Sequence, residues 1–218
     1  MSAVATDLPS RTSGCFLMSG IESSLHASGI SRIAGVEEAG RGPCAGPLVV
    51  AAAILKNPDS PNLARVRDSK ALNEKIRGAI YEVIIQESLS CSMIEISSHE
   101  IDAMGLSKSN LEGMRRAVNS LGVVPDYVLT YGYSIEGLAT PSLTVWKGDQ
   151  VALSISAASI LAKVYRDRIM IEMDCKYPGY GFATDKGYIT AAHSASMKEL
   201  SLTEIHRLSF SNVAALLY

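Results

Sequence analysis

The chain has 218 residues, of which 47% are hydrophobic, a size and composition that suit one globular domain with or without a terminal appendage. The formal net charge is -2, so no overall positive field attracts nucleic acid, and any such contact must come from local clusters. The four cysteines are scattered with no Cys-x-x-Cys pair, which argues against a zinc site or disulfide framework and fits a reducing cytosol. No apolar run approaches the roughly 18 residues of a membrane-spanning helix, so we expect no membrane association.

The first part of the chain is rich in serine, glycine and alanine and shows little periodicity. Its apolar stretch at residues 15–18 is too short for a signal-peptide core and has no basic stretch directly before it. We therefore expect residues 1–30 to form a mobile extension and residues 31–218 to form the single domain.

The rest of the chain alternates between strand-like and helix-like patterns. Short apolar or alternating runs bounded by glycine, proline or polar turns indicate strands, and apolar residues at helical spacing indicate helices. In chain order they predict strands at 33–37 and 47–55, a helix at 71–86, a strand at 90–97, a helix at 107–121, strands at 126–130 and 142–146, a long helix at 152–174, and a mostly helical segment at 189–218. This order predicts an α/β domain with a mixed sheet.

Two adjacent carboxylates, Glu37 and Glu38, end the first strand and are followed by the loop Gly40-Arg41-Gly42. Clustered carboxylates stay ionised only beside a cation, and hard oxygen ligands select Mg²⁺ or Mn²⁺ over zinc. For the dipeptide alone, a solvated acidic pair is the stronger interpretation. The glycine loop favours a functional site, because amides without side chains can approach a ligand closely.

A polar stripe crosses the long apolar helix, at Ser156, Ser159, Lys163 and Asp167. Spacings of three and four residues place all four on one face, which predicts that the stripe borders a cleft. The alternative is an ordinary Lys–Asp pair on a solvated face. With Asp167 as a third carboxylate, two ions about 4 Å apart could stabilise the attacking water and the leaving oxygen of a phosphodiester.

Over about residues 31–212, the chain resembles the bacterial ribonuclease HII (type 2 ribonuclease H) family. Several of the shared motifs are long and occur in the family's order. They are residues 35–55, 68–70, 110–118, 125–129, 147–149, 154–163 with 166–168, 177–182, 186–188 with Thr190, and 205–207 with 209–210.

The resemblance implies an RNase H-like fold, with a mixed five-stranded sheet flanked by helices and a C-terminal helical extension. It implies endonucleolytic cleavage of RNA in RNA–DNA hybrids and of duplex DNA with embedded ribonucleotides. The cut falls 5′ of the ribonucleotide and leaves a 3′-hydroxyl and a 5′-phosphate, with Mn²⁺ or Mg²⁺ as cofactor. It further implies a cytoplasmic monomer.

The resemblance also assigns substrate-binding residues. Gly40, Arg41 and Gly42 match the loop whose backbone senses the ribose 2′-hydroxyl, the group that distinguishes RNA from DNA. Tyr188 matches a tyrosine that packs on the neighbouring deoxyribose, although a lone tyrosine is more often half-buried packing. Lys70, Lys163 and Arg166 match positions near the nucleic-acid backbone, with plain surface solvation as the alternative for each.

The chain departs from the family at two of its four acids. Glu38 and Asp167 are as expected, but Glu37 and Tyr131 stand where the family has aspartate. The resemblance implies that Glu37, Glu38 and Asp167 are catalytic and bind metal, with Tyr131 at the third of the family's four acid positions. Asp126 cannot replace the missing acid, because it lies five residues upstream, on the order of 16 Å away along a strand.

These departures predict a weakened metal site. Glu37 extends its carboxylate by more than 1 Å, roughly one methylene, and Mg²⁺ demands ligands at about 2.0–2.1 Å in octahedral geometry. The phenol of Tyr131 has a reference pKa of about 10 and is neutral at pH 7. Because rates depend steeply on placement, we expect a loss of roughly 100-fold or more.

Three functions are compatible with these residues. The first is an active or impaired ribonuclease HII, and the second is a catalytically inactive protein that binds RNA–DNA hybrids and junctions. The third is another metal nuclease of the same fold that acts on DNA. The loop Gly40-Arg41-Gly42 together with Tyr188 argues against the third, since the family uses them to sense a ribose beside a deoxyribose.

Overall fold

The computed structural model describes residues 20–66, 73–146 and 152–217. Two motifs that carry the family resemblance, at residues 68–70 and 147–149, lie outside the described residues. Lys70, an expected substrate contact, belongs to the first of them, so its expected role stays a prediction.

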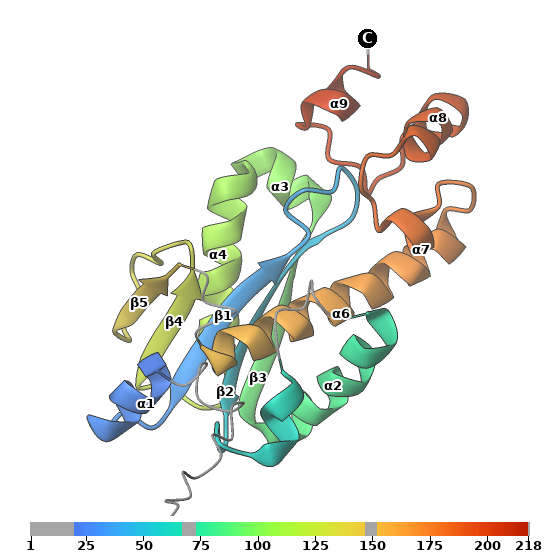
Figure 1. Ribbon diagram of the computed structural model, residues 1–218. Helices are drawn as coiled ribbons and strands as arrows, with labels where there is room; N and C mark the ends of the chain where they lie inside the picture. Colours follow the sequence, from blue (N-terminus) through green and yellow to red (C-terminus); the bar gives the residue numbers. More distant parts are fainter. Residues whose placement is uncertain (1–19, 67–72, 147–151, 218) are drawn as a thin grey trace, which may run out of the picture.

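A mixed five-stranded sheet forms the centre of the molecule, in the order β3-β2-β1-β4-β5 (Figure 1). Strand β1 pairs antiparallel with β2 and parallel with β4, β2 pairs antiparallel with β3, and β4 pairs parallel with β5. The prediction of a mixed sheet is therefore confirmed. The strands are β1 (Ile33–Ala39), β2 (Leu48–Leu55), β3 (Ser88–Ile96), β4 (Tyr127–Tyr131) and β5 (Ser142–Val145).

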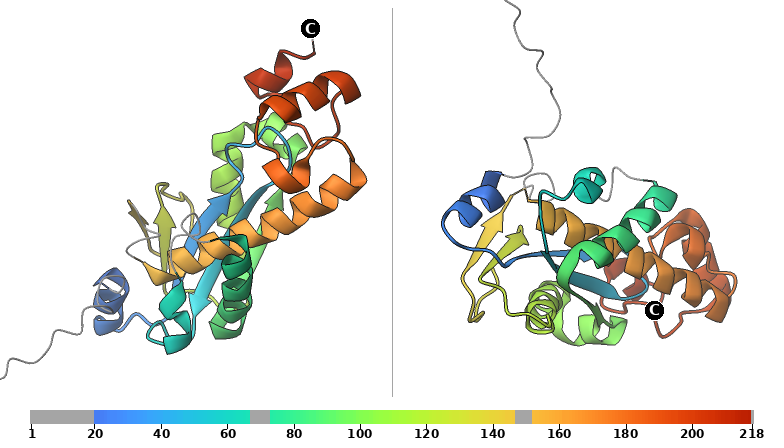
Figure 2. Two further views of the ribbon diagram at one scale, coloured as in Figure 1. Left: turned by 45° about the vertical axis from the view of Figure 1, so that its right-hand side comes forward. Right: turned by 90° about the horizontal axis from the view of Figure 1, so that it is seen from below.

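Helices cover both faces of this sheet (Figures 1 and 2). The long helix α6 (Leu153–Lys176) packs on one face with α2 (Glu74–Glu87), and α4 (Leu106–Asn119) packs on the other. The interior strand β2 is buried along its whole length, as expected for an apolar run covered on both sides. The short helix α3 (Ser98–Met104), which the sequence patterns did not predict, precedes α4.

Helix α6 approaches strand β1 unusually closely at Gly35. A Cβ atom on Gly35 would lie 2.1 Å from the backbone carbon of Ser154, so no side chain fits there. This approach places the helix that carries Asp167 directly over the strand that carries the two glutamates. The sheet therefore positions the candidate site through its backbone as well as through its side chains.

The segment after α6 contains α7 (Phe182–Asp185), α8 (Ala191–Leu200) and α9 (Ser211–Ala214), which gather at one end of the molecule (Figure 1). The expectation of a mostly helical C-terminal segment is only partly correct. Residues 201–210 between α8 and α9 are not helical, and His206 instead forms an isolated antiparallel bridge with Ala45.

A short 3-10 helix, η1 (Pro61–Arg65), follows β2.

Helix α1 (Gly20–Ala27) lies inside the stretch that we expected to be a mobile extension. Its residue Glu22 is only 2% exposed and accepts hydrogen bonds from the backbone amides of Leu153 (2.7 Å) and Ser154 (3.0 Å). The expectation is therefore wrong for residues 20–27. The carboxylate of Glu22 on α1 accepts from the first amides of α6, which lack partners within that helix, and this contact fixes α1 in place. Helix α1 lies at the opposite end of the molecule from α7–α9 (Figure 2).

Membrane-spanning helices are not found among the described residues, since none of the helices there is both long and apolar enough.

Candidate functional site

The two adjacent glutamates at the end of β1 point to opposite faces of the sheet. Glu37 pairs with Ala51, which packs in the cluster under α6, whereas Glu38 pairs with Val50, which packs in the cluster under α4. Neighbouring residues of a strand alternate between faces, and directly paired residues share one. Glu37, 8% exposed, therefore faces α6, and Glu38 faces α4.

Glu38 lies in a largely buried polar environment. Its Oε1 is 3.6 Å from a guanidinium nitrogen of Arg41, and its Oε2 is buried with no hydrogen-bond partner. Burial raises the pKa of Glu38, while the charge of Arg41 and the side-chain amide of Asn110 oppose that increase. Asn110, on α4, is fully buried. The site thus contains a carboxylate whose negative charge is only partly compensated.

Tyr131 occupies the end of β4, beside the end of β1. Val36 pairs with Thr130, and the next residues along the two parallel strands are Glu37 and Tyr131. The ring of Tyr131 is partly buried and packs against the apolar cluster that includes Leu129 and Val145. The residue at the third family acid position therefore lies beside Glu37 but contributes to packing.

Asp167 on α6 is 5% exposed and lies between two cations. Its carboxylate is 2.7 Å from Nζ of Lys163 and 3.8 Å from a guanidinium nitrogen of Arg77 on α2. These residues border a pocket of about 240 Å³ between α2 and α6, lined by Glu74, Arg77, Gly78, Val164, Asp167, Arg168 and Ile171. The Lys163–Asp167 contact of the alternative interpretation is therefore present. Its carboxylate is buried, however, and does not lie on a solvated face.

The acids that the resemblance implies as metal ligands do not form one cluster. Among the described residues, no group of three His, Cys, Asp or Glu side chains is arranged to hold an ion. Glu37 and Glu38 diverge from β1, Asp167 is held by Lys163 and Arg77, and Tyr131 is turned into packing. The side chains as they stand do not fit a bound Mg²⁺ or Mn²⁺.

Arg166 is not a surface contact for nucleic acid, and that expectation is wrong. Its side chain is 1% exposed, and its guanidinium donates to the carbonyls of Pro47 (2.9 Å), Lys186 (2.9 Å) and Ala45 (3.1 Å). Burial lowers the pKa of Arg166 to about 10, so it stays charged at pH 7. The charge of an arginine suggests that it is exposed to solvent. Here the N–H donors of the guanidinium find backbone carbonyls as partners, so the side chain can be buried.

A second buried arginine, Arg207, holds the other side of the same loop. Its guanidinium donates to the carbonyls of Gly40 (2.7 Å), Arg41 (3.2 Å) and Gly46 (2.9 Å). Burial and the nearby Arg166 lower the pKa of Arg207 to about 9, which still leaves it charged at pH 7. The two guanidinium groups together hold the carbonyls of Gly40, Arg41, Ala45, Gly46 and Pro47. This is a strong constraint, because hydrogen bonds from charged donors are the stronger class.

The loop Gly40-Arg41-Gly42 and Tyr188 are brought together, as the resemblance implied. A Cβ on Gly42 would lie 3.2 Å from the ring of Tyr188, whose side chain is 49% exposed. Gly40 has φ of 94°, and a Cβ there would lie 2.1 Å from Nε of Arg166. Arg41 turns back to hydrogen-bond the hydroxyl of Tyr133 and stacks over its ring at 4.7 Å.

Sequence reasoning missed several residues of this region. Arg77 and Tyr133 bear on the acids only through contacts between distant elements, and no local pattern identifies them. Residues 205–207 were noticed only as part of the resemblance, without a role for Arg207. The only available signal for Arg207 was that it stands beside another polar residue, His206, within the shared motif at residues 205–207.

Comparisons with known proteins identify the family and the fold of this chain. The sequence profile of the family described as Ribonuclease HII matches residues 34–213. The protein named Ribonuclease HII from Rhodococcus opacus (strain B4) is 50% identical over 208 residues, which cover 95% of this chain and 91% of that protein.

Solved structures match the fold as well. The ribonuclease H2 of Pyrococcus horikoshii OT3 superposes with a TM-score of 0.74 at 25% identity, covering 85% of this chain and 96% of that one. Bst-RNase HIII in complex with Mn²⁺ gives a TM-score of 0.71 at 20% identity, covering 89% and 71%. The fold is thus RNase H-like, and the chain belongs to the ribonuclease HII family of type 2 ribonuclease H endonucleases.

Proposed function

We propose that this chain recognises RNA–DNA hybrids and duplex DNA with embedded ribonucleotides, and that it hydrolyses them with impaired efficiency. The contact between Gly42 and the half-exposed ring of Tyr188 carries this proposal. Two glycines leave backbone amides accessible to a 2′-hydroxyl, and an exposed ring offers an apolar face to a deoxyribose. The buried guanidinium groups of Arg166 and Arg207 support recognition by holding that loop rigid.

The cofactor that we propose is Mn²⁺ or Mg²⁺, since a fold relative, Bst-RNase HIII, was solved with Mn²⁺. A bound divalent ion would supply Lewis-acid stabilisation of charge on the phosphate. The hard oxygen donors at the end of β1 are Glu37 and Glu38, whose carboxylates diverge and would have to turn toward one ion. The ion pairs of Asp167 with Lys163 and Arg77 compete with a third ligand, so we expect weak occupancy.

A second candidate function is binding without cleavage. Tyr131 removes one acid, and Asp167 is already neutralised by two cations, while the loop that contacts Tyr188 is complete. An inactive protein that still binds a ribonucleotide in duplex DNA is consistent with both observations. We further propose that the protein acts as a cytoplasmic monomer, and the free Cys44, Cys91 and Cys175 are consistent with a reducing compartment.

One experiment separates these functions. The protein is incubated with duplex DNA carrying one ribonucleotide, with an RNA–DNA hybrid, and with all-DNA duplex, in Mg²⁺ and separately in Mn²⁺. Products are mapped, and binding is measured in parallel by fluorescence anisotropy at fixed salt. We expect slow incision 5′ of the ribonucleotide, faster in Mn²⁺. Tight binding without incision supports the second function, and equal cutting of all-DNA duplex overturns both.

A further inference from the structure

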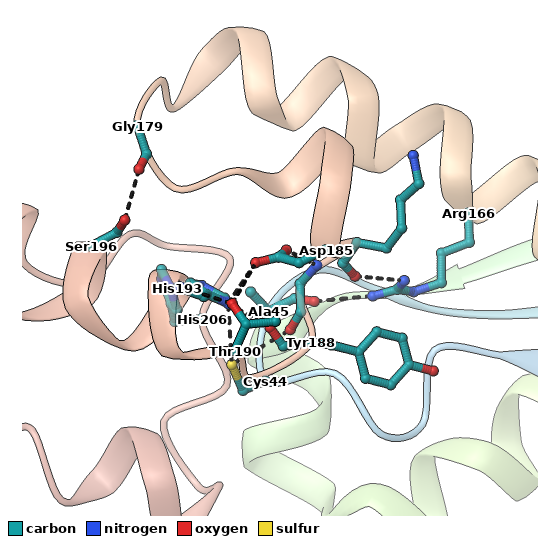
Figure 3. A network of polar contacts seen from close by, with 12 residues as sticks. Cys44, Ala45, Arg166, Gly179, Asp185, Tyr188, Thr190, His193, Ser196 and His206 are labelled. Atoms are coloured by element: carbon teal, nitrogen blue, oxygen red, sulfur yellow. Dashed lines mark hydrogen bonds and ion pairs between the residues drawn. The ribbon is translucent and has the colours of Figure 1, made fainter.

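Two buried histidines lie behind Tyr188 and face each other (Figure 3). His193 on α8 is 0% exposed and His206 is 1% exposed, and their Nε2 atoms are 3.2 Å apart. Nδ1 of His193 lies 2.9 Å from the carbonyl oxygen of Tyr188. At the other end, Nδ1 of His206 lies 2.9 Å from both the backbone nitrogen and Oγ1 of Thr203, and 3.3 Å from its carbonyl oxygen. A chain of four polar groups therefore runs from Thr203 to Tyr188.

The two backbone groups at the ends determine the tautomer of each imidazole. The carbonyl of Tyr188 can only accept, so Nδ1 of His193 carries a hydrogen. The amide of Thr203 can only donate, and it lies closer to Nδ1 of His206 than the carbonyl oxygen of Thr203 does. We therefore assign Nδ1 of His206 as the acceptor and place its hydrogen on Nε2. Nε2 of His193 then accepts from His206, and every donor in the relay points toward Tyr188.

Other polar groups near His193 lie farther away than the carbonyl of Tyr188. Oδ2 of Asp185 is 3.7 Å and Sγ of Cys44 is 3.9 Å from Nδ1, against 2.9 Å for the carbonyl. The carboxylate of Asp185 is itself engaged, because its Oδ1 accepts from the amide of Gly187 at 2.8 Å. The proton on Nδ1 therefore bonds the backbone of Tyr188, and Asp185 tightens the same turn from its other side.

Aromatic rings bury the relay. The rings of Tyr180 and Phe182 stack at 5.2 Å and pack against both imidazoles, with centroids between 5.3 and 6.4 Å apart. Burial, with the neighbouring His193, lowers the pKa of His206 to about 4. The arrangement of donors thus persists at neutral pH.

The relay and the buried arginine come from adjacent residues, His206 and Arg207. Their backbone pairs antiparallel with the loop, since Arg207 donates to the carbonyl of Cys44 at 2.8 Å and Gly46 donates to the carbonyl of Ile205 at 2.8 Å. Arg207 holds the carbonyls of Gly40 and Arg41, and His206 acts through His193 on Tyr188. One dipeptide thereby sets the distance between the glycine loop and the tyrosine.

We propose that His193 and His206 are positioning residues for junction specificity, which set the ring of Tyr188 against Gly42 through this directional relay. The inference rests on the proposed function, because it assumes that Tyr188 and the loop read a ribose beside a deoxyribose. The relay hydrogen-bonds the backbone carbonyl of Tyr188. The ring of Tyr188 extends away from the two histidines (Figure 3). The histidines therefore act without touching the substrate.

The first test measures binding, which does not depend on the rate of hydrolysis. His193→Leu removes the relay, whereas His193→Asn retains a donor near the Nδ1 position. We expect His193→Leu to reduce the preference for duplex DNA with one ribonucleotide over all-DNA duplex by about 5- to 10-fold, and His193→Asn to stay within about 2-fold of the parent. In a Tyr188→Ala background, His193→Leu should have no further effect, because the two act as a unit.

A second test needs no substrate. Imidazole ¹⁵N shifts of the parent should show the hydrogen on Nδ1 of His193 and on Nε2 of His206. A nuclear Overhauser contact between the ring of Tyr188 and Gly42 should be present in the parent and in His193→Asn and lost in His193→Leu. Thermal unfolding shows that each variant is folded.

The two tests distinguish this inference from the proposed function. If the tautomers and the Tyr188–Gly42 contact behave as expected but the parent prefers no ribonucleotide, the proposed function is wrong and the positioning role stands. If the parent has the preference and His193→Leu retains it, or if His193→Leu acts equally in the Tyr188→Ala background, the positioning role is wrong. Other tautomers in the parent overturn it directly.

Discussion

At the residue scale, Tyr131 puts a phenol in place of a carboxylate beside Glu37, which limits the negative charge of the site. We expect Tyr131→Asp to raise the rate of incision by about 100-fold, because it returns a short acid to the end of β4. Tyr131→Phe is the matched control and should leave the parent rate unchanged. Cleavage of a duplex with one ribonucleotide and titration calorimetry with Mn²⁺ measure the two effects.

Combining Tyr131→Asp with Glu37→Asp should increase the rate further, since Mg²⁺ tolerates little displacement of its ligands. Tyr131→Asp also removes ring packing, and we expect it to lower the free energy of unfolding by roughly 1–3 kcal/mol. A fast parent enzyme whose rate is unaffected by Tyr131→Asp would refute the role assigned to this position.

Gly40 combines a left-handed backbone with a crowded Cβ position. Gly40→Ala places a methyl group about 2.1 Å from the guanidinium of Arg166, so Arg166 must leave its three carbonyls. Gly137→Ala is the matched control, because Gly137 also has positive φ (75°) but nothing within 4 Å of its Cβ position. We expect a loss of at least ~3 kcal/mol for Gly40→Ala and about 1 kcal/mol for Gly137→Ala. Urea unfolding measures both, and equal losses would show that the clash is relieved without cost.

At the element scale, α1 caps the helix that carries Asp167. Glu22→Ala removes a buried carboxylate that accepts from two amides at the start of α6, and we expect a loss of roughly 2 kcal/mol. Glu22→Gln retains one acceptor oxygen and should cost about half as much. Hydrogen exchange of the amides of Leu153 and Ser154 localises the effect, and unchanged protection in Glu22→Ala would disprove the capping role.

The sheet and its main helices follow closely from the sequence. Strands β1 and β2 were predicted to within a few residues, because uninterrupted apolar runs bounded by glycine and proline leave few alternatives. Helix α1 was not predicted, since its carboxylate finds amides 131 positions further along the chain. Local periodicity contains no information about such a contact.

The site was predictable in its parts and less so in their contacts. The meeting of Gly42 with Tyr188, and the place of Tyr131 beside Glu37, follow the expectation from the family resemblance. The burial of Arg166 does not, because an arginine is normally placed outside unless its donors find partners, and those partners were backbone carbonyls. The gathering of three acids was expected and is not observed among the described residues.

At the scale of the whole molecule, stability should depend on pH through His206. Its folded-state pKa of about 4 lies below the ordinary value of 6.5, so the unfolded chain binds the proton more readily between these values. Stability is therefore full above about pH 6.5 and falls by about 3 kcal/mol as the pH drops to about 4. Urea unfolding across this range measures the loss. His206→Gln should flatten it, and an unchanged slope in that variant would contradict the assignment.

A further loss of folding stability should follow at lower pH, through Glu100. Hydrogen bonds from Arg116 and from the backbone of Ser97 lower the pKa of Glu100, so its contribution is present above the ordinary carboxyl range and disappears as the pH falls through its folded value. This pair is largely exposed, and its share is small.

The adjacency of His206 and Arg207 has a consequence for the order of folding during synthesis. All five strands and α6 are complete once residue 176 has been made, so the sheet can assemble from the chain already emerged. The carbonyls of Gly40 and Arg41 gain their cation only when residue 207 follows. A nascent chain can therefore form its scaffold before its means of distinguishing ribose from deoxyribose, which delays substrate recognition until residue 207 has been made.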